Sequence, residues 1–179
     1  MEHNEPAADE AAAQLAALSA LDGILERLGL DYWLFGGWAV DFWVGRITRT
    51  HDDIDLAVWR DDYPGIRQAL EAAGWRYDPV EDAAIGAGFR SGAVLVELTF
   101  VVSDPTGQVF IPFPEQPGLW STVPFGTDRR TLQGVSCRTV PLSLLRAGKA
   151  VPRDDAEDGA KDRADFLAIT HIHDDDVGI

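Results

Sequence analysis

Two aspartates separated by one apolar residue, Asp53 and Asp55, constrain this chain more than any other feature. They open an apolar run that continues to Val58 and has the composition of a buried strand. Side chains alternate across a strand, so the two carboxylates point the same way while Ile54 points into a core. Adjacent carboxylates repel each other. Mg²⁺ prefers oxygen ligands and typically takes one or two carboxylates plus substrate phosphates, so the pattern predicts a magnesium site.

A glycine pair precedes the aspartates. Gly36 and Gly37 end a β-like run, 32–35, and precede a helix-like run, 38–43. Glycine lets backbone N–H groups approach a phosphate closely, and the N-terminus of a helix favours negative charge. The pair therefore predicts a phosphate-binding turn.

The residues between this turn and the aspartates are basic. Arg46, Arg49 and His51 lie there, and arginine meets phosphate through a planar fork of N–H donors. We therefore expect Arg46 and Arg49 to bind phosphate charge. Asp41, on the short helix, is expected to orient a ligand or the basic loop, with an ordinary surface acid of the helix as an equal alternative.

A longer string of residues surrounds these features. It reads Gly36-Gly37-Trp38-Ala39-Val40-Asp41, then Gly45-Arg46, Thr48-Arg49 and His51-Asp52-Asp53-Ile54-Asp55-Leu56. The string resembles the nucleotidyltransferase superfamily that includes DNA polymerase β. Within it, the chain is similar to the antibiotic-modifying branch of aminoglycoside 2''-O-adenylyltransferases and lincosamide nucleotidyltransferases.

This resemblance implies an α+β nucleotidyltransferase fold, a mixed β-sheet flanked by helices with a C-terminal helix. It implies that Asp53 and Asp55 hold a pair of Mg²⁺ ions. It also implies transfer of a nucleoside monophosphate, AMP from ATP, onto a hydroxyl of a small molecule such as an aminoglycoside or a lincosamide. Gly36 and Gly37, with Arg46 or Arg49, would then stabilise the pyrophosphate leaving group.

The longest strand candidate, 93–102, is apolar except for Glu97 and Thr99. A buried carboxylate without a partner is costly, so the acid faces either solvent or a site. The resemblance implies the second case, with Glu97 as a third active-site carboxylate. Glu97 would then take the proton of the acceptor hydroxyl and help to hold metal.

The last helix is expected at 156–172, and the residues predicted to face inward are Ala160, Ala164, Phe166, Leu167 and Ala168. Its Lys161-Asp162-Arg163-Ala164-Asp165 run is similar to a helix near the end of small nucleotidyltransferases. The similarity implies that Lys161 reaches the triphosphate. A surface pair between Lys161 and Asp165 is the alternative. His171 and His173, next to acids, are taken as a frayed tail and not as a metal site.

The net charge of −15 argues against a nucleic-acid partner, because such proteins usually carry a basic stripe. An acidic surface attracts cationic ligands, although acidity can also serve only solubility.

No apolar run is long enough to cross a bilayer, and the polar N-terminus is not typical of a secretory signal. Cys137 is the one cysteine and is expected to be a packed strand residue. A cytoplasmic location fits these features.

The chain length suits one domain, predicted at 9–173, between a disordered tail at 1–8 and an acidic tail at 174–179. Alternating helix and strand patterns predict a mixed α/β or α+β sheet. The first helix carries an apolar stripe: Leu15, Leu18, Leu21, Leu25 and Leu28. The 2''-O-adenylyltransferase that this chain resembles carries further C-terminal helices. Without them the wall of the acceptor site would be incomplete in a monomer, so a homodimer is expected.

The aromatic segment 110–125 has two interpretations. In one, an acceptor pocket is lined by its aromatic residues, and in the other these residues fill a core; they are Phe110, Phe113, Trp120 and Phe125.

Two alternative functions of the whole protein also stay open. One is a nucleotidyltransferase-like member of a toxin–antitoxin pair acting on a partner protein. The other is a biosynthetic enzyme acting on a sugar hydroxyl.

Overall fold

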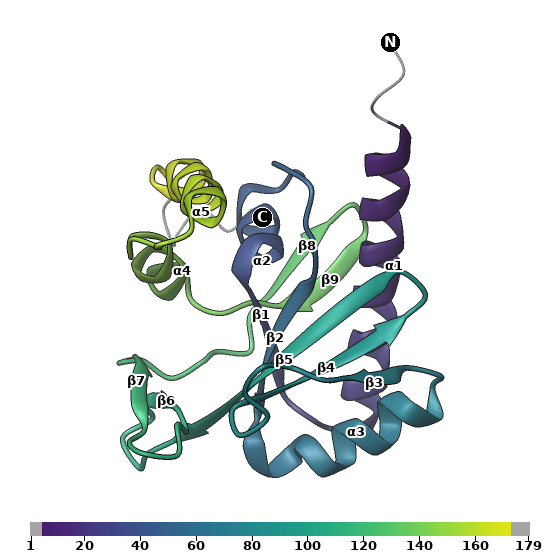
Figure 1. The fold of residues 1–179 in the computed structure, drawn as a ribbon, viewed down its shortest axis with the longest axis vertical. Helices are drawn as coiled ribbons and strands as arrows, with labels where there is room; N and C mark the ends of the chain where they lie inside the picture. Colours follow the sequence, from purple (N-terminus) through teal and green to yellow (C-terminus); the bar gives the residue numbers. More distant parts are fainter. Residues whose placement is uncertain (1–4, 173–179) are drawn as a thin grey trace.

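The computed structural model describes residues 5–172, in which helices and strands alternate as far as α3 and are followed by seven strands and two final helices (Figure 1). The helices are α1 (Glu5–Leu28), α2 (Gly36–Val44), α3 (Tyr63–Ala72), α4 (Leu142–Lys149) and α5 (Ala156–Ile169), with a 3₁₀ turn, η1 (Arg60–Asp62). The strands are β1 (Tyr32–Phe35), β2 (Ile54–Trp59), β3 (Arg76–Asp78), β4 (Gly86–Ser91), β5 (Val94–Ser103), β6 (Val109–Ile111), β7 (Gly118–Ser121), β8 (Arg129–Leu132) and β9 (Val135–Arg138).

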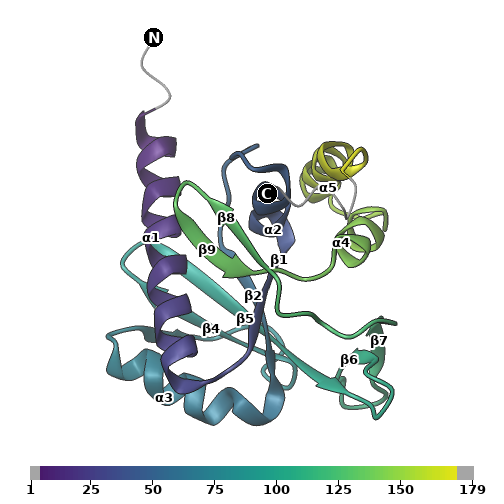
Figure 2. The same ribbon diagram turned by 180° about the vertical axis from the view of Figure 1, so that it is seen from behind.

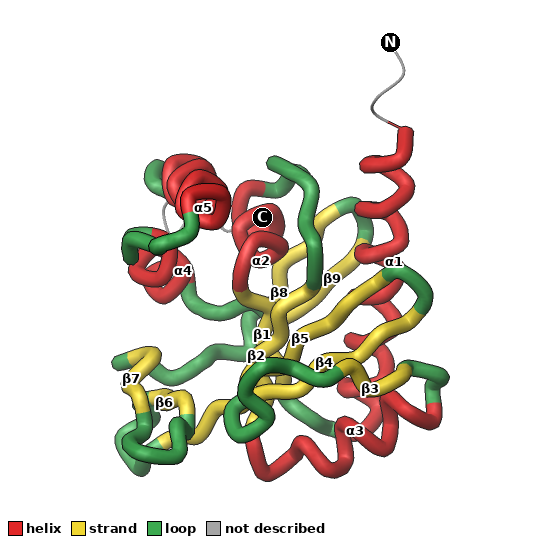
Figure 3. Tube along the Cα trace, in the orientation of Figure 1, coloured by secondary structure: helices red, strands yellow, loops and turns green. Residues whose placement is uncertain are grey.

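The sheet runs in the order β1-β2-β5-β4-β3. β2 and β5 are parallel, while β1–β2, β5–β4 and β4–β3 are antiparallel. β6 pairs with the end of β5 and with β7, so these strands project from one side of the sheet (Figure 3). β8 and β9 form a separate ribbon. The prediction of an α+β fold with a mixed, helix-flanked sheet is confirmed.

The helices form two groups. α1 and α3 contact each other and cover one side of the sheet, the side nearer the viewer in Figure 2. α2 packs against α4 and α5, away from α1 (Figure 1). Within residues 5–172, no helix is both long and apolar enough to cross a membrane.

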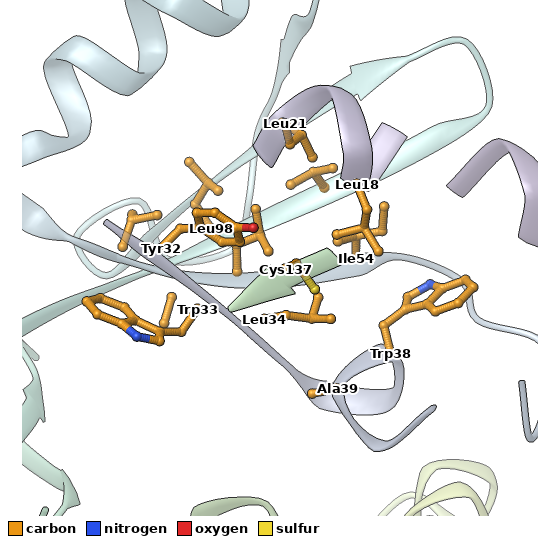
Figure 4. Packing of buried hydrophobic residues seen from close by; sticks show 14 of the residues in the cluster. Leu18, Leu21, Tyr32, Trp33, Leu34, Trp38, Ala39, Ile54, Leu98 and Cys137 are labelled. Atoms are coloured by element: carbon orange, nitrogen blue, oxygen red, sulfur yellow. The ribbon is translucent and has the colours of Figure 1, made fainter. Parts of the chain in front are cut away.

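The core lies between α1 and the sheet. Leu18 and Leu21 of α1 lie over Ile54, Leu98 and the other buried strand residues (Figure 4). Leu15 and Leu25 are buried as the stripe predicts, but Leu28 is 52% exposed because it ends the helix.

Cys137 belongs to the same core (Figure 4). Its thiol is free and fully buried, and burial raises the pKa of the thiol to about 12. A thiol with so high a pKa carries almost no thiolate at neutral pH and is a poor nucleophile. The expectation of a packed strand residue is met.

The predicted N-terminal boundary needs correction. Helix α1 begins at Glu5, so part of the tail predicted at 1–8 is helical. Residues 1–4 and the tail predicted at 174–179, together with His173, lie outside the described residues.

The predicted inward face of α5 is wrong for three of its five residues, whereas Ala168 packs against the core as predicted. Leu167 is 70% exposed, and Ala160 and Ala164 are exposed as well. Asp162 and Asp165 are buried instead. They face cations contributed by α4 and the loop before β2, so charge pairing sets the rotation of this helix.

The rotation of α5 can be tested by truncating two of its apolar residues. Ile169 is fully buried, so Ile169→Ala should lower the free energy of unfolding by about 2–5 kcal/mol through lost burial and the cavity left behind. Leu167→Ala, the matched control, should change it by less than about 0.5 kcal/mol. Urea unfolding of the two variants measures both values. A larger loss for Leu167→Ala than for Ile169→Ala would contradict the observed packing.

Candidate active site

Three carboxylates converge at the end of the β2–β5 pair. Asp55 and Glu97 are directly opposite each other in the register of the two parallel strands, and Asp53 immediately precedes β2. One carboxylate oxygen from each of the three residues lies within 4.8 Å of the other two. The structure therefore brings together the three acids expected at the site.

The three groups share an unfavourable electrostatic environment. Burial and the neighbouring charges of Asp53 and Glu97 raise the pKa of Asp55 to about 8. Burial also raises the pKa of Asp53, as does the charge of Asp52, and burial and Asp53 raise that of Glu97. Three oxygen donors held this close fit a divalent cation, which would remove their mutual repulsion.

The turn before α2 approaches these carboxylates closely. Gly36 has φ +68°, and a Cβ at this position would lie 2.1 Å from Asp55 Oδ2. A Cβ on Gly37 would lie 2.4 Å from Arg49 Nη2 and 2.6 Å from His51 Nδ1. Both positions therefore require glycine, and the N-terminus of α2 faces the acids. Such a helix end is a favourable place for a phosphate.

Asp41 is buried beneath the basic loop and does not line the cleft. Its Oδ1 accepts hydrogen bonds from the Thr48 backbone N–H at 3.0 Å and from the Thr48 hydroxyl at 2.5 Å. Its Oδ2 lies 2.6 Å from His51 Nε2. The Gln14 amide holds the His51 carbonyl from α1, and Trp38 donates to Gln14. Asp41 thus orients the loop, and the expectations of direct ligand contact or a surface position are not met.

A cleft of about 410 Å³ surrounds the three carboxylates and the glycine turn. One wall is apolar and consists of Phe35, Trp120, Val140, Leu144 and Leu145. Another wall is cationic and consists of Arg49, Lys149, Arg153 and Lys161. The cleft therefore combines an acidic floor with a cationic wall, which suits a ligand carrying several phosphates.

The two arginines of the basic loop, Arg46 and Arg49, differ in their contacts and in whether they line the cleft. Arg49 donates from Nε and Nη2 to Asp165 at 3.0 and 2.9 Å, and from Nη1 to the Thr50 carbonyl at 2.9 Å. Arg46 is exposed and does not line the cleft. The structure therefore does not bring Arg46 to the carboxylates, and it ties Arg49 to α5.

Lys161 reaches the cleft but is already paired. Its Nζ lies 3.0 Å from Asp52 and 3.1 Å from Glu157. The alternative expectation of a pair with Asp165 is wrong, because Asp165 instead binds Arg49 and Lys149. Lys161 thus connects α5 to the loop that carries Asp53.

Lys149 and Arg153 line the cleft and were missed in the sequence. Lys149 Nζ lies 2.7 Å from Asp162 and 2.8 Å from Asp165, and Arg153 Nε donates to Asp162 at 2.5 Å. The available signal was the spacing of Asp162, Asp165 and Ile169, three and four residues apart on one helix face.

The aromatic segment divides between the two interpretations given above. Trp120 lines the cleft, and its ring packs against Phe35 with centroids 5.1 Å apart. Phe125 packs against Trp33 and Trp120 and serves the core. Phe110 and Phe113 do not line the cleft.

The raised pKa of Asp55 gives stability a pH dependence in metal-free protein. Its ordinary value is 3.8, so the folded state holds the proton over a range where the unfolded chain releases it. The resulting stabilisation is complete below about pH 4 and is lost as the pH rises to about 8. In EDTA, the Tm of wild type relative to Asp55→Asn should therefore fall between about pH 6 and pH 8.

Magnesium should reverse this loss, because it binds ionised carboxylates. We expect Mg²⁺ to raise the Tm of wild type more at about pH 8 than at pH 6, and to leave Asp55→Asn nearly unchanged. Differential scanning fluorimetry with and without Mg²⁺ measures both effects. Equal Mg²⁺ shifts in wild type and variant would exclude Asp55 as a ligand.

Comparison with known proteins places these features in context. Residues 17–87 match the family model described as aminoglycoside-2''-adenylyltransferase. A 2''-aminoglycoside nucleotidyltransferase from Escherichia coli is 40% identical over 60 residues, which cover 33% of this chain and 31% of that protein. A lincosamide resistance protein from Staphylococcus haemolyticus is 34% identical over 55 residues, which cover 31% of this chain and 34% of that protein. The matched segments thus span about a third of these relatives.

Two solved structures share the fold over most of its length. The lincomycin-bound lincosamide antibiotic adenylyltransferase LnuA has a TM-score of 0.66 and 16% identity, covering 84% of this chain and 92% of its own. ANT(2'')-Ia in complex with adenylyl-2''-tobramycin has a TM-score of 0.63 and 20% identity, covering 88% of this chain and 90% of its own. This chain therefore has the nucleotidyltransferase fold and resembles, most closely over residues 17–87, the aminoglycoside-2''-adenylyltransferase family.

Proposed function

We propose that this protein transfers a nucleoside monophosphate, AMP from ATP, to a hydroxyl of a small antibiotic-like acceptor. The observation that carries the proposal is the convergence of Asp53, Asp55 and Glu97 beside a glycine turn in one cleft. The names of the relatives support it, since they act on aminoglycosides or lincosamides.

The three carboxylates would hold Mg²⁺, and two ions fit the chemistry of such transfers. Bound there, the metal supplies charge neutralisation for the phosphates and makes the acceptor hydroxyl more acidic. Glu97, the acid on the neighbouring strand, would accept the proton of that hydroxyl. Burial raises the pKa of Glu97, which makes it a stronger base than an ordinary carboxylate once it is ionised.

The turn at the start of α2 would bind the phosphates. The backbone N–H groups of Gly36 and Gly37 sit at the N-terminus of this helix and can donate to phosphate oxygens. These donors are fixed before the reaction begins, so they cost little reorganisation as charge moves to the leaving pyrophosphate.

The acceptor is proposed to be cationic. The floor of the cleft is acidic and the chain carries a net charge of −15, so a cationic acceptor is attracted, whereas a long polyanion that extends beyond the cationic wall is repelled. This argues for an aminoglycoside before a nucleic acid. A cytoplasmic location fits a consumer of nucleoside triphosphates, and the single reduced Cys137 is compatible with it. The expected homodimer stays a prediction.

The function can be tested by pyrophosphate release from purified protein with ATP or GTP, Mg²⁺ and a panel of aminoglycosides and lincosamides. The proposal expects release that depends on one class of small acceptor and a product heavier by one nucleoside monophosphate. Release that requires a partner protein instead would favour the toxin–antitoxin alternative. No transfer to any hydroxyl compound with any nucleotide would contradict the proposal.

Removing one carboxylate at a time separates the proposed roles. Asp53→Asn should lose more than about nine tenths of turnover because a metal ligand is gone. Glu97→Gln should keep nucleotide binding but lose turnover by about 100-fold, the usual contribution of a general base. Steady-state kinetics and nucleotide titration measure these effects.

The matched control is Glu71→Gln, which changes charge equally in an exposed ion pair outside the cleft. It should leave turnover unchanged. Retention of wild-type turnover by Glu97→Gln would remove Glu97 from the proposed mechanism.

A further inference from the structure

One polar residue interrupts the apolar stripe of α1. Gln14 lies four residues before Leu18 and seven before Leu21, so it belongs to the same helix face, and it is only 2% exposed. A buried amide costs free energy unless its polar atoms form hydrogen bonds, and an apolar residue at this position would avoid that cost. The partners of Gln14 therefore indicate what the amide does there.

Both partners of Gln14 belong to elements of the candidate active site. Its Nε2 donates to the His51 carbonyl at 2.9 Å, and its Oε1 accepts from the Trp38 indole N–H at 2.9 Å. His51 lies two residues before Asp53, and Trp38 directly follows Gly37 at the start of α2 (Figure 4). One amide of α1 thus connects the helix that follows the glycine turn to the loop that carries the first of the three carboxylates.

The backbone of this loop depends on side chains for its position. Residues 46–52 form neither helix nor strand, and within the described part of the chain their backbone groups make no hydrogen bond to another backbone group. An open pocket of about 380 Å³ lies between the start of α1 and the loop, with Ala11, Ile47 and Thr50 in its lining. Close packing against α1 therefore does not fix this part of the loop.

Side chains hold the loop backbone at separate points. Asp41 accepts from the Thr48 N–H, and Gln14 donates to the His51 carbonyl. Among the described residues, the bond from Gln14 is the side-chain contact to the loop backbone that lies nearest to Asp53 along the chain. A displacement of the His51 carbonyl is therefore carried to Asp53 across only two residues.

Ring packing alone does not replace this contact. The Trp38 ring packs on the His51 ring with centroids 4.6 Å apart, which holds α2 against the loop without a hydrogen bond. Packed rings can slide past each other, whereas N–H···O bonds weaken steeply when they depart from linearity. The Gln14 amide therefore adds a fixed direction and distance to the contact between α2 and the loop.

We infer that Gln14 is a positioning residue for the metal site, which acts on Asp53 through the His51 carbonyl and is anchored to α2 by Trp38. The inference rests on the proposed function, since it takes the three carboxylates as ligands of Mg²⁺. Gln14 does not line the cleft, so it touches neither metal nor nucleotide. Removing a group that orients metal ligands from outside the coordination sphere typically costs about 10–100-fold in metal affinity or activity.

Mn²⁺ binding tests the inference without nucleotide, acceptor or turnover, and electron paramagnetic resonance of the free ion measures it. Gln14→Met keeps the length of the side chain and removes the amide, so it should weaken Mn²⁺ binding by about tenfold or more. The matched control is Leu18→Ala, which truncates a residue that is 1% exposed on the same face of α1. It should bind Mn²⁺ within about twofold of wild type, because it does not contact the loop.

The Trp38 indole N–H gives a second readout in metal-free protein. Its NMR resonance, assigned by its absence in Trp38→Phe, should move upfield in Gln14→Met, because the indole loses its acceptor. In turnover at saturating Mg²⁺, Gln14→Met should lower kcat by about tenfold and change the KM of the nucleotide by less than about threefold. The KM changes less because the backbone amides of the glycine turn are still present.

Trp38→Phe decides the matter if Gln14→Met does not fold. It removes the anchor of the amide alone and should weaken Mn²⁺ binding by about threefold or more. Wild-type Mn²⁺ affinity in either folded variant, an equal loss in Leu18→Ala, or a wild-type protein that binds no Mn²⁺ would overturn the inference. Mn²⁺ binding that depends on Gln14 in a protein that transfers no nucleotide would support the positioning role and contradict only the proposed function.

Discussion

The parallel pairing of β2 with β5 is the constraint on which the rest of the site depends. It sets Asp55 directly opposite Glu97, and the residue before β2 adds Asp53. Gly36 in the left-handed conformation then brings the start of α2 against the same carboxylates. Repulsion among the acids is the cost of this arrangement, and it appears as raised pKa values. The fold thus stores an unfavourable charge cluster that a cation can relieve.

Cations line the cleft beside the three carboxylates, and acids of α5 hold these cations in place. α5 turns its acids inward, and these hold Lys149, Arg153 and Arg49 along the wall of the cleft. Buried ion pairs of this kind contribute little net stability, because desolvation offsets their attraction. They do fix position. The loop before β2 is held from three sides, by Asp165 through Arg49, by Lys161 through Asp52, and by Asp41 from below.

The three carboxylates of this site could be predicted from the sequence, but the cations that line the same cleft could not. Strand alternation was enough to place Asp53 and Asp55 on one side, whereas the role of Glu97 came from the family resemblance, because the strand pattern alone left this acid facing either solvent or a site. Glycine chemistry likewise anticipated the turn at Gly36. The role of Asp41 was left open because its hydrogen bonds depend on how a loop folds back. Lys149 was missed because its partners, Asp162 and Asp165, lie on the next helix and meet it only when α4 and α5 pack together.

The face of α5 was wrong for a related reason. An apolar stripe predicts burial only when the neighbouring surface is apolar, and here the neighbours are cations. Buried acids therefore take the place expected for Ala160, Ala164 and Leu167. Sequence periodicity predicts the structure of a single helix or strand well. The ion pairs that bridge α4, α5 and the basic loop form only when the chain is folded, so periodicity does not reveal them.

Anomalous diffraction from crystals soaked with Mn²⁺ and a non-hydrolysable ATP analogue tests the central claim most directly. Mn²⁺ takes the same oxygen ligands as Mg²⁺ and reveals its own position. The account predicts anomalous density among the carboxylates of Asp53, Asp55 and Glu97. Full occupancy of the nucleotide with the metal bound elsewhere, or with Glu97 turned away from it, would contradict the account.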